Sequence, residues 1–159
     1  MNLFAENRIF LNQSFASSDE LFDFVGKQME DLGMAKAGFG DSLKHRESSY
    51  PTGLPGLTAD IALPHTDPEF IVEPFIAVVS TKEGVPFTQM GSDSIKLSPR
   101  LFFILGFKKE GAERYQTEAL RAIVDNFLAN DEGKLTGRFL KLDASKDCME
   151  ILCKIQKEI

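Results

Sequence analysis

The sequence predicts a single α/β domain in which a mixed β-sheet is flanked by helices on both faces. Two apolar runs, residues 75–79 and 101–107, are continuous rather than alternating, and strands of this kind are buried on both sides. The flanking segments carry the apolar periodicity of amphipathic helices, and helices outside a central sheet form a layered α/β domain. A chain of 159 residues can bury a full core, so we expect residues 1–159 to form one domain.

Composition and charge exclude several classes of protein. Hydrophobic residues make up 43% of the chain and charged residues 26%, which is typical of a soluble globular protein. The net charge of −6 does not provide the basic face that a nucleic-acid-binding protein needs. No apolar run approaches the ~18 residues of a membrane span, and residues 1–8 lack the pattern of a signal peptide. We therefore expect a cytoplasmic protein that binds no nucleic acid and is not inserted in a membrane.

The N-terminal part of the chain predicts one short strand and two helices. Residues 8–11 suit a first strand. A helix is expected to begin at Ser17 and Ser18, where hydroxyl caps are followed by acidic residues, and to end at Gly33. A second, weaker helix is predicted at residues 42–47.

A turn-rich connection, residues 48–56, leads into a short apolar run at residues 59–63. This run ends at Pro64, and proline tends to end a strand because it cannot donate a hydrogen bond to the ladder. We therefore expect His65 at the end of a strand, followed by a turn at residues 67–69.

The rest of the chain predicts two short edge strands, at residues 85–87 and 94–97, and a helical C-terminal third. The apolar stripe of the first C-terminal helix is formed by Tyr115, Ala119, Ile123 and Phe127. A last helix is predicted to begin at residues 143–145 and to contain Met149, Leu152, Cys153 and Gln156.

His65 is the main candidate for chemistry. A histidine at a strand end with polar groups on both sides is suited to nucleophilic or acid–base chemistry, whereas the alternative is a half-exposed turn residue without a role. The other histidine, His45, directly precedes Arg46. Adjacent helical residues point about 100° apart, so His45 is expected on the surface if Arg46 faces the site.

The cysteines do not predict a disulfide or a metal site. Cys148 and Cys153 are expected on different faces of the last helix, which fits a reduced, intracellular protein. The two histidines and two cysteines lie far apart in the sequence, and there is no glycine-rich phosphate loop. We therefore predict no metal and no cofactor.

Four motifs occur in a fixed order: Arg-Glu at residues 46–47, Pro-Thr-Gly-Leu at 51–54, Pro-His-Thr-Asp-Pro at 64–68 and Phe-Thr-Gln-Met-Gly at 87–91. Together they resemble the IIA proteins of the sugar phosphotransferase system (PTS), in the mannitol/fructose superfamily (EIIA type 2). Within that superfamily the chain is most similar to the galactitol-specific IIA proteins. The resemblance extends from the first predicted helix to the last and implies the mannitol/fructose-type IIA fold.

The resemblance implies that His65 accepts a phosphoryl group from the carrier protein HPr and passes it to a cysteine of a IIB protein. The IIB protein then phosphorylates a sugar or polyol during uptake through a membrane IIC protein, so contact with the membrane component is indirect. The donor is a phosphoprotein, and no nucleotide is required. A neutral imidazole is a good nucleophile near pH 7, and phosphoryl transfer depends mostly on positioning and charge stabilisation.

Two other functions are consistent with the sequence. One is a regulatory protein of the same fold, in which phosphorylation of His65 controls binding to a partner protein. The other is a hydrolase that uses His65 as a general base, but the candidate nucleophiles in residues 48–52 lack an elbow motif.

The resemblance also assigns roles around His65. Arg46 matches the active-site arginine of the family, whose guanidinium pairs with phosphoryl oxygens; the alternative is a surface ion pair with Glu47. Thr52 falls at the family's threonine position, where it either donates to the phosphoryl group or is only a turn hydroxyl. Apart from the resemblance, Asp67 or Glu69 is a candidate for orienting the imidazole, as carboxylates do in other proteins, unless both are solvated turn residues.

The chain departs from the common family pattern at two positions. Many mannitol- and fructose-type members have a second histidine at the start of the helix after the long strand, and here that position falls on Glu113 or Gln116. Galactitol-type relatives also tend to lack it, so a polar residue such as Gln116 would hold the phosphoryl group instead. Asp60 stands where many relatives have glycine, and we expect it to face away because a carboxylate repels phosphate.

Overall fold

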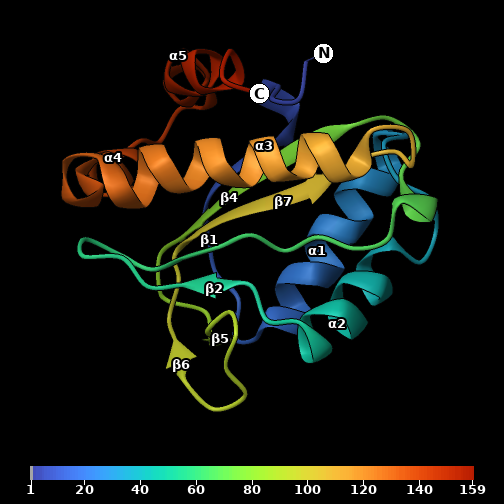
Figure 1. Cartoon of the computed structure of the whole chain (residues 1–159), viewed down its shortest axis with the longest axis horizontal. Helices are drawn as coiled ribbons and strands as arrows, with labels where there is room; N and C mark the ends of the chain where they lie inside the picture. Colours follow the sequence, from blue (N-terminus) through green and yellow to red (C-terminus); the bar gives the residue numbers. More distant parts are fainter. Residues whose placement is uncertain (1) are drawn as a thin grey trace.

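The computed structural model describes residues 2–159 and contains a five-stranded mixed sheet with helices on both faces (Figure 1). The strands lie in the spatial order β1 (Ile9–Gln13), β4 (Phe75–Thr81), β7 (Leu101–Gly106), β3 (Ile61–Ala62) and β2 (Gly53–Leu54). Strands β1 and β4 are parallel, as are β3 and β7, whereas the β4–β7 and β2–β3 pairs are antiparallel. The predicted fold class is confirmed.

The two faces of the sheet are covered by different helices (Figure 1). One face packs against α1 (Ser18–Asp31) and α2 (Phe39–Ser49). The other packs against α3 (Ala112–Val124), α4 (Lys134–Phe139) and α5 (Ser145–Gln156). The remaining helical turns are η1 (Glu6–Arg8), η2 (Pro68–Phe70), η3 (Asp125–Ala129) and η4 (Asn130–Gly133). Among the described residues, no helix has the length and apolar character needed to cross a membrane.

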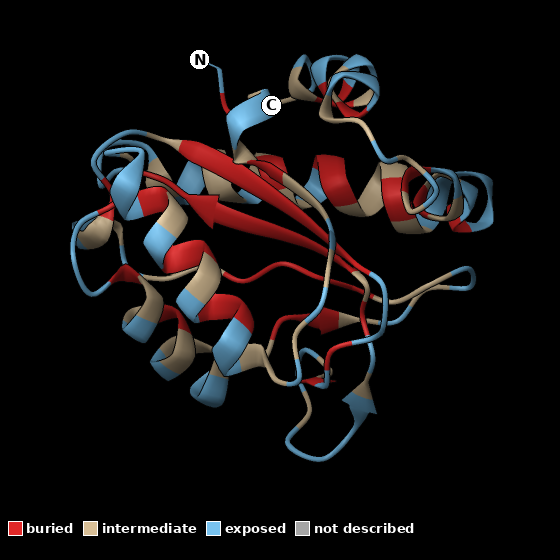
Figure 2. Cartoon of the chain, turned by 180° about the vertical axis from the view of Figure 1, so that it is seen from behind, coloured by how far each residue is buried: buried red, intermediate tan, exposed pale blue. Residues whose placement is uncertain are grey.

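The side chains of β4 and β7 alternate between two hydrophobic cores, because successive residues of a strand point to opposite faces. The core beneath α1 and α2 contains Phe75, Ala77, Val79, Phe102 and Ile104. The core beneath α3 and α5 contains Ile76, Val78, Leu101, Phe103 and Leu105. Figure 2 shows these strands buried along their length, while the outer sides of the helices are exposed. Two covered faces explain why both sequence runs are continuously apolar.

Helix α1 begins and ends where the sequence predicts. The Ser17 hydroxyl accepts a hydrogen bond from the Glu20 amide at 3.2 Å, and Gly33 follows the helix with a positive φ of 71°. Helix α2 is longer than the predicted residues 42–47. It begins directly after Gly38, whose φ of 93° is in the left-handed region that glycine adopts most easily. The glycines in this segment weaken the helix pattern in the sequence.

The apolar stripe predicts one continuous helix through Phe127, but the structure interrupts this helix before Phe127. Helix α3 ends at Val124, and Phe127 lies in the following π-helical turn, η3. The wider turn does not expose Phe127, whose ring is fully buried. The centroid of this ring lies 4.8 Å from that of Phe103 and 5.6 Å from that of Phe139. The stripe therefore predicts correctly that Phe127 is buried, but not that it belongs to a regular α-helix.

The two predicted edge strands form a separate hairpin instead of extending the main sheet. Strands β5 (Phe87–Thr88) and β6 (Lys96–Leu97) pair with each other. The hairpin is joined to the sheet through an isolated bridge between Gly53 and Gln89. This contact places the hairpin next to the end of β2.

Phe103→Ala is expected to lower the free energy of unfolding by about 3–5 kcal/mol, because it leaves a cavity between β7 and the aromatic ring of Phe127. Urea denaturation measures this change. Leu57→Ala is the matched surface control, since Leu57 is 84% exposed, and it should change stability by less than about 0.5 kcal/mol. Similar losses in the two variants would contradict the described packing.

Candidate functional site

His65 lies just beyond β3, where backbone pairing with β7 fixes its position. The Leu105 amide donates to the Pro64 carbonyl at 2.9 Å, and His65 forms an isolated parallel bridge with Leu105. Pro64 has no N–H, but its carbonyl still accepts, so the pairing continues past the end of the strand. The predicted location of His65 at a strand end is therefore observed.

The imidazole of His65 is partly buried and held in one tautomer. Its Nδ1 atom is 2.8 Å from the carbonyl oxygen of Leu63. A carbonyl only accepts, so Nδ1 carries the proton and Nε2 keeps a free lone pair. Burial is the main cause that lowers the pKa of His65; the Leu63 hydrogen bond raises this pKa, and the charge of Arg46 lowers it further. The ring is therefore a neutral nucleophile near pH 7.

Arg46 on α2 is a cation without a carboxylate partner. None of the ion pairs among residues 2–159 includes Arg46, and its buried Nε atom has no hydrogen-bond partner. Its guanidinium carbon lies 4.3 Å from the centre of the Tyr50 ring, one helical turn further along. Arg46 is also close enough for its charge to act on His65. A positive charge in this state is suited to bind an anion.

Glu47 does not pair with its neighbour Arg46; it binds Thr52 instead. The Thr52 amide donates to Glu47 Oε1 at 2.8 Å, and the Thr52 hydroxyl lies 2.8 Å from Oε2. Burial raises the pKa of Glu47 to about 7, although both hydrogen bonds from Thr52 lower it. The Thr52 hydroxyl donates its single proton to this carboxylate, so the proton is not free for another acceptor.

A second contact connects α2 to the segment that follows His65. The hydroxyl groups of Ser42 and Thr66 are hydrogen-bonded. Ser42 and Arg46 are four residues apart on α2 and therefore lie on the same face of the helix. This face of α2 thus contacts the residue after His65 and directs a charge at the imidazole.

Within residues 2–159, the three predicted supporting residues do not line the cavity at His65. Asp67 and Glu69 are exposed, and the Nδ1 partner is the Leu63 carbonyl rather than either carboxylate. Gln116 is partly buried on α3 and does not line the cavity at His65. Glu113 is exposed in the first turn of the same helix. His65 and Thr52 line one cavity, and the charge of Arg46 acts on His65.

The carboxylate of Asp60 binds backbone amides of two loops. Its carboxylate accepts hydrogen bonds from the amides of Gly56 at 3.3 Å and Ser98 at 3.2 Å. It precedes β3, whereas His65 follows it, so the carboxylate is used at the opposite end of the strand. His45 is exposed, as predicted.

A cavity of about 740 Å³ opens next to His65. One wall is formed by residues 49–52 and the other by residues 89–93 and 95 of the β5–β6 hairpin. The two walls are joined by a hydrogen bond from the Met90 amide to the Gly53 carbonyl at 2.7 Å. The exposed large side chains at this cavity are Tyr50, Met90 and Ile95. Their apolar surface surrounds the approach to the imidazole.

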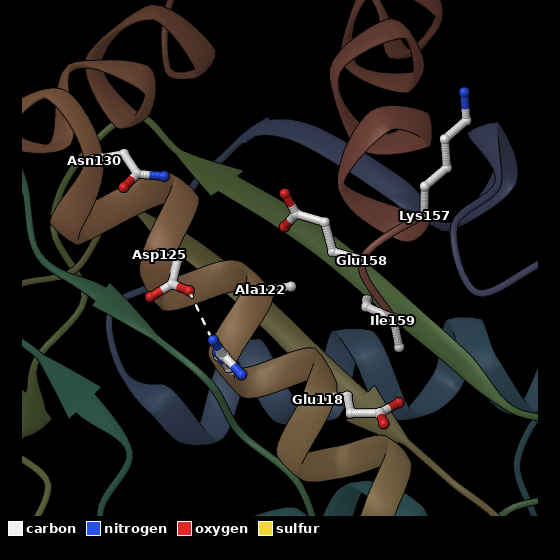
Figure 3. Close-up of a pocket in the computed structure, with 8 residues that line it drawn as sticks. Glu118, Ala122, Asp125, Asn130, Lys157, Glu158 and Ile159 are labelled. Atoms are coloured by element: carbon white, nitrogen blue, oxygen red, sulfur yellow. Dashed lines mark ion pairs between the residues drawn. The ribbon is translucent and has the colours of Figure 1, made fainter.

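A different cavity, of about 510 Å³, lies between α3, η3 and the last residues of the chain (Figure 3). Its charged groups include both signs, and Arg121 pairs with Asp125 at 3.7 Å, as the dashed line in Figure 3 shows. Of the described residues that line it, none is a histidine, cysteine, serine or threonine. The cavity at His65 is therefore the better candidate for a reaction.

The structure adds no metal or disulfide chemistry to the site. Within residues 2–159, no cluster of three or more His, Cys, Asp or Glu side chains could hold a metal ion. Cys148 is buried and Cys153 exposed, and both are free thiols, so they do not bond each other. Their different burial agrees with the prediction that they lie on different faces of the last helix.

Sequence reasoning missed Glu47 and Tyr50 as parts of the site. Tyr50 follows Arg46 by four residues, which is the spacing of neighbours on a helix surface. Glu47 was considered only as an ion-pair partner of Arg46. The sequence offers no direct signal for its contact with Thr52, which depends on how the chain turns after α2.

The chain matches a family model. Residues 2–153 match the family described as "Phosphoenolpyruvate-dependent sugar phosphotransferase system, EIIA 2". Among curated proteins, no significant match to the chain is found.

Solved structures with the same fold cover nearly the whole chain. The crystal structure of IIA mannitol from Escherichia coli has a TM-score of 0.71 at 22% identity, covering 94% of this chain and 98% of that one. The Escherichia coli complex of enzyme IIA and phosphorylated enzyme IIB for mannitol gives 0.74 at 20%, covering 95% and 97%. The nitrogen regulatory protein IIA-Ntr from Neisseria meningitidis gives 0.71 at 20%, with the same coverage.

Arg46→Gln is expected to raise the pKa of His65, because it removes a positive charge that disfavours the imidazolium. The pKa should stay below 6.5, since burial is the larger cause of its lowering. As the pH falls, the variant will therefore lose its neutral imidazole at a higher pH than the wild type. A ¹⁵N NMR titration of His65 measures this. Arg138→Gln, at an exposed position on α4, is the control, and equal shifts in both variants would contradict the assignment.

Proposed function

This chain belongs to the phosphoenolpyruvate-dependent sugar phosphotransferase system EIIA 2 family, and we propose that it is a IIA phosphocarrier in which His65 carries the phosphoryl group. The observation that carries this proposal is a neutral imidazole with Nε2 free, together with an Arg46 guanidinium that has no counter-ion among residues 2–159. A nucleophile and an anion-binding cation are the two groups that phosphoryl transfer requires here.

In the first transfer, the Nε2 lone pair of His65 attacks the phosphorus of a phosphohistidine on the carrier HPr. The N–P bond of the donor breaks, its electron pair returns to the donor imidazole, and an Nε2–P bond forms. Nδ1 keeps its proton, and the Leu63 carbonyl stabilises the positive charge that the ring gains. Arg46 pairs with the phosphoryl oxygens, so its unsatisfied Nε gains an acceptor.

In the second transfer, the thiolate of a IIB cysteine attacks the phosphorus, and the electron pair of the Nε2–P bond returns to His65. A relative of this chain has been solved in complex with phosphorylated enzyme IIB, which supports IIB as the acceptor. HPr and IIB must reach the same imidazole in turn. The open cavity with its apolar rim of Tyr50, Met90 and Ile95 suits such transient docking.

The remaining assignments are part of the same proposal. We place the protein in the cytoplasm, where IIB would connect it to the membrane IIC component. We infer a galactitol-like sugar or polyol from the motifs at residues 51–54 and 64–68, together with the absence of histidine from residues 107–124. Asp67, Glu69 and Gln116 stay predicted supporting residues for the phosphorylated state.

A regulatory role is the second candidate, because the structurally similar proteins include the nitrogen regulatory protein IIA-Ntr. Phosphorylation of His65 would then change the affinity for a partner protein. The two functions differ at the second transfer. A carrier loses its phosphoryl group to a IIB cysteine, whereas a regulator keeps it and binds its partner more or less tightly.

His65→Ala is expected to abolish phosphorylation by phosphoenolpyruvate, Enzyme I and HPr, because it removes the one imidazole that lines the cavity within residues 2–159. Intact mass spectrometry should show the gain of one phosphoryl group on the wild type and none on the variant. His45→Ala tests the other histidine and should behave as the wild type does. Phosphorylation of His65→Ala would refute the site.

Arg46→Ala is expected to slow transfer from HPr by about 10²–10³-fold, which is the usual effect of removing one group that stabilises a developing anion. Rapid quench with labelled phosphoenolpyruvate measures the rate. Circular dichroism checks that the domain remains folded. A wild-type rate would mean that Arg46 is only a surface charge.

Addition of a galactitol-type IIB protein to the phosphorylated chain separates the two functions. A carrier should lose its phosphoryl group within seconds to minutes and transfer it to the IIB cysteine. Retention of the group, with an active IIB protein, would favour the regulatory role.

A further inference from the structure

A relay of three hydrogen bonds connects Glu47 on α2 to the imidazole of His65. Glu47 Oε1 accepts from the Thr52 amide at 2.8 Å, and the Thr52 carbonyl accepts from the Leu63 amide at 3.3 Å. The Leu63 carbonyl in turn accepts from His65 Nδ1 at 2.8 Å. Every link joins a donor to an acceptor, so Thr52 and Leu63 are each held through both their backbone N–H and their backbone C=O.

Glu47 is the one member of this relay that is not held by strand pairing. Thr52 and Leu63 lie at the ends of the β2–β3 hairpin, where a one-residue change of register would move every side chain to the other face. The carboxylate binds both the amide and the hydroxyl of Thr52, which is itself only 2% exposed. Glu47 therefore fixes the start of β2 relative to α2.

Among the described residues, Thr52 is the polar partner of Glu47. Within residues 2–159, Glu47 forms no ion pair, and all of its side-chain hydrogen bonds come from Thr52. A partly buried carboxylate without a cation costs free energy, as its raised pKa records. Among the described residues, only the hydrogen bonds from Thr52 offset this cost, which indicates that the carboxylate serves to hold Thr52.

We propose that Glu47 is a positioning residue for His65, which holds Nδ1 protonated and Nε2 free by fixing Thr52 and, through it, the Leu63 carbonyl. The consequence for phosphoryl transfer rests on the proposed function of the chain. The consequence for the tautomer does not, because it is a property of the unphosphorylated protein. Loss of the acceptor at position 47 releases the Leu63 carbonyl and lets the imidazole exchange tautomers or rotate.

Two substitutions separate hydrogen bonding from packing. Glu47→Gln keeps an acceptor for the Thr52 amide and can donate to its hydroxyl, so it preserves the relay. Glu47→Leu has a similar size but removes the acceptor. Long-range ¹H–¹⁵N NMR of His65 reports the tautomer, and quench measurements with phosphorylated HPr report the transfer rate.

For Glu47→Leu we expect a mixture of tautomers and a transfer rate lower by about 10- to 100-fold, the effect seen when an orienting partner of a metal-bound histidine is lost. Glu47→Gln should keep the Nδ1–H tautomer and a rate within about threefold of the wild type. Glu73→Leu is the matched control, because Glu73 is exposed and its side chain has no hydrogen bond among the described residues.

Wild-type behaviour of Glu47→Leu in both measurements would overturn the proposal. Equal losses in Glu47→Leu and Glu47→Gln would also overturn it, since charge rather than the relay would then be responsible. If Glu47→Leu does not fold, Thr52→Val removes the hydroxyl contact while keeping the amide, and the same two readouts should fall between wild type and a broken relay. A wild-type chain that shows the Nδ1–H tautomer but takes no phosphoryl group would refute the proposed function alone.

Discussion

The parallel pairing of β3 with β7 is the constraint on which the site depends. Strand β3 has only two residues, Ile61 and Ala62, and both are fully buried. Its pairing continues through the Pro64 carbonyl, which accepts from Leu105, so that His65 is placed next to the end of β7. Because side chains alternate along a strand, a slip of one residue would turn the imidazole to the other face. The two cores on either side of β7 prevent that slip.

Helix α2 is the second support of the site, and its neighbouring residues have different partners. Ser42 contacts Thr66 after the histidine, and Glu47 binds Thr52, whose carbonyl reaches the segment before it. Arg46, between them, has no counter-ion and is stacked on Tyr50. Such an unpaired charge weakens the fold, and its presence close to His65 is typical of functional sites. The helix thus positions the imidazole and supplies its cation.

The sequence was most informative where one physical rule decides the outcome. Continuous apolar runs required a sheet covered on both faces, and Pro64 marked the end of the strand before His65. It was less informative where a tertiary contact overrides local preference. Glycines at positions 38 and 40 weaken the helix pattern at the start of α2. Gly40 is required by packing rather than by local preference, because a Cβ at this position would lie only 2.9 Å from the Phe22 carbonyl oxygen of α1. The sequence predicts Asp67 or Glu69 as the partner of His65 Nδ1, but the observed partner is the backbone carbonyl of Leu63. A backbone carbonyl is present at every residue, so the sequence does not indicate which one accepts this hydrogen bond.

The charge of Arg46 can serve both states of the proposed carrier without any movement of a proton. Before transfer it lowers the pKa of His65 and so favours the neutral nucleophile. After transfer the same charge faces a phosphoryl dianion and stabilises it. A carrier must also release its group, and a site that bound the phosphorylated state too tightly would slow the second transfer. Among the described residues, Arg46 is the one cation whose charge acts on His65, and it is not itself part of the lining of the cavity. A single arginine, held by stacking rather than by a carboxylate, suits a phosphoryl group that is only passing through.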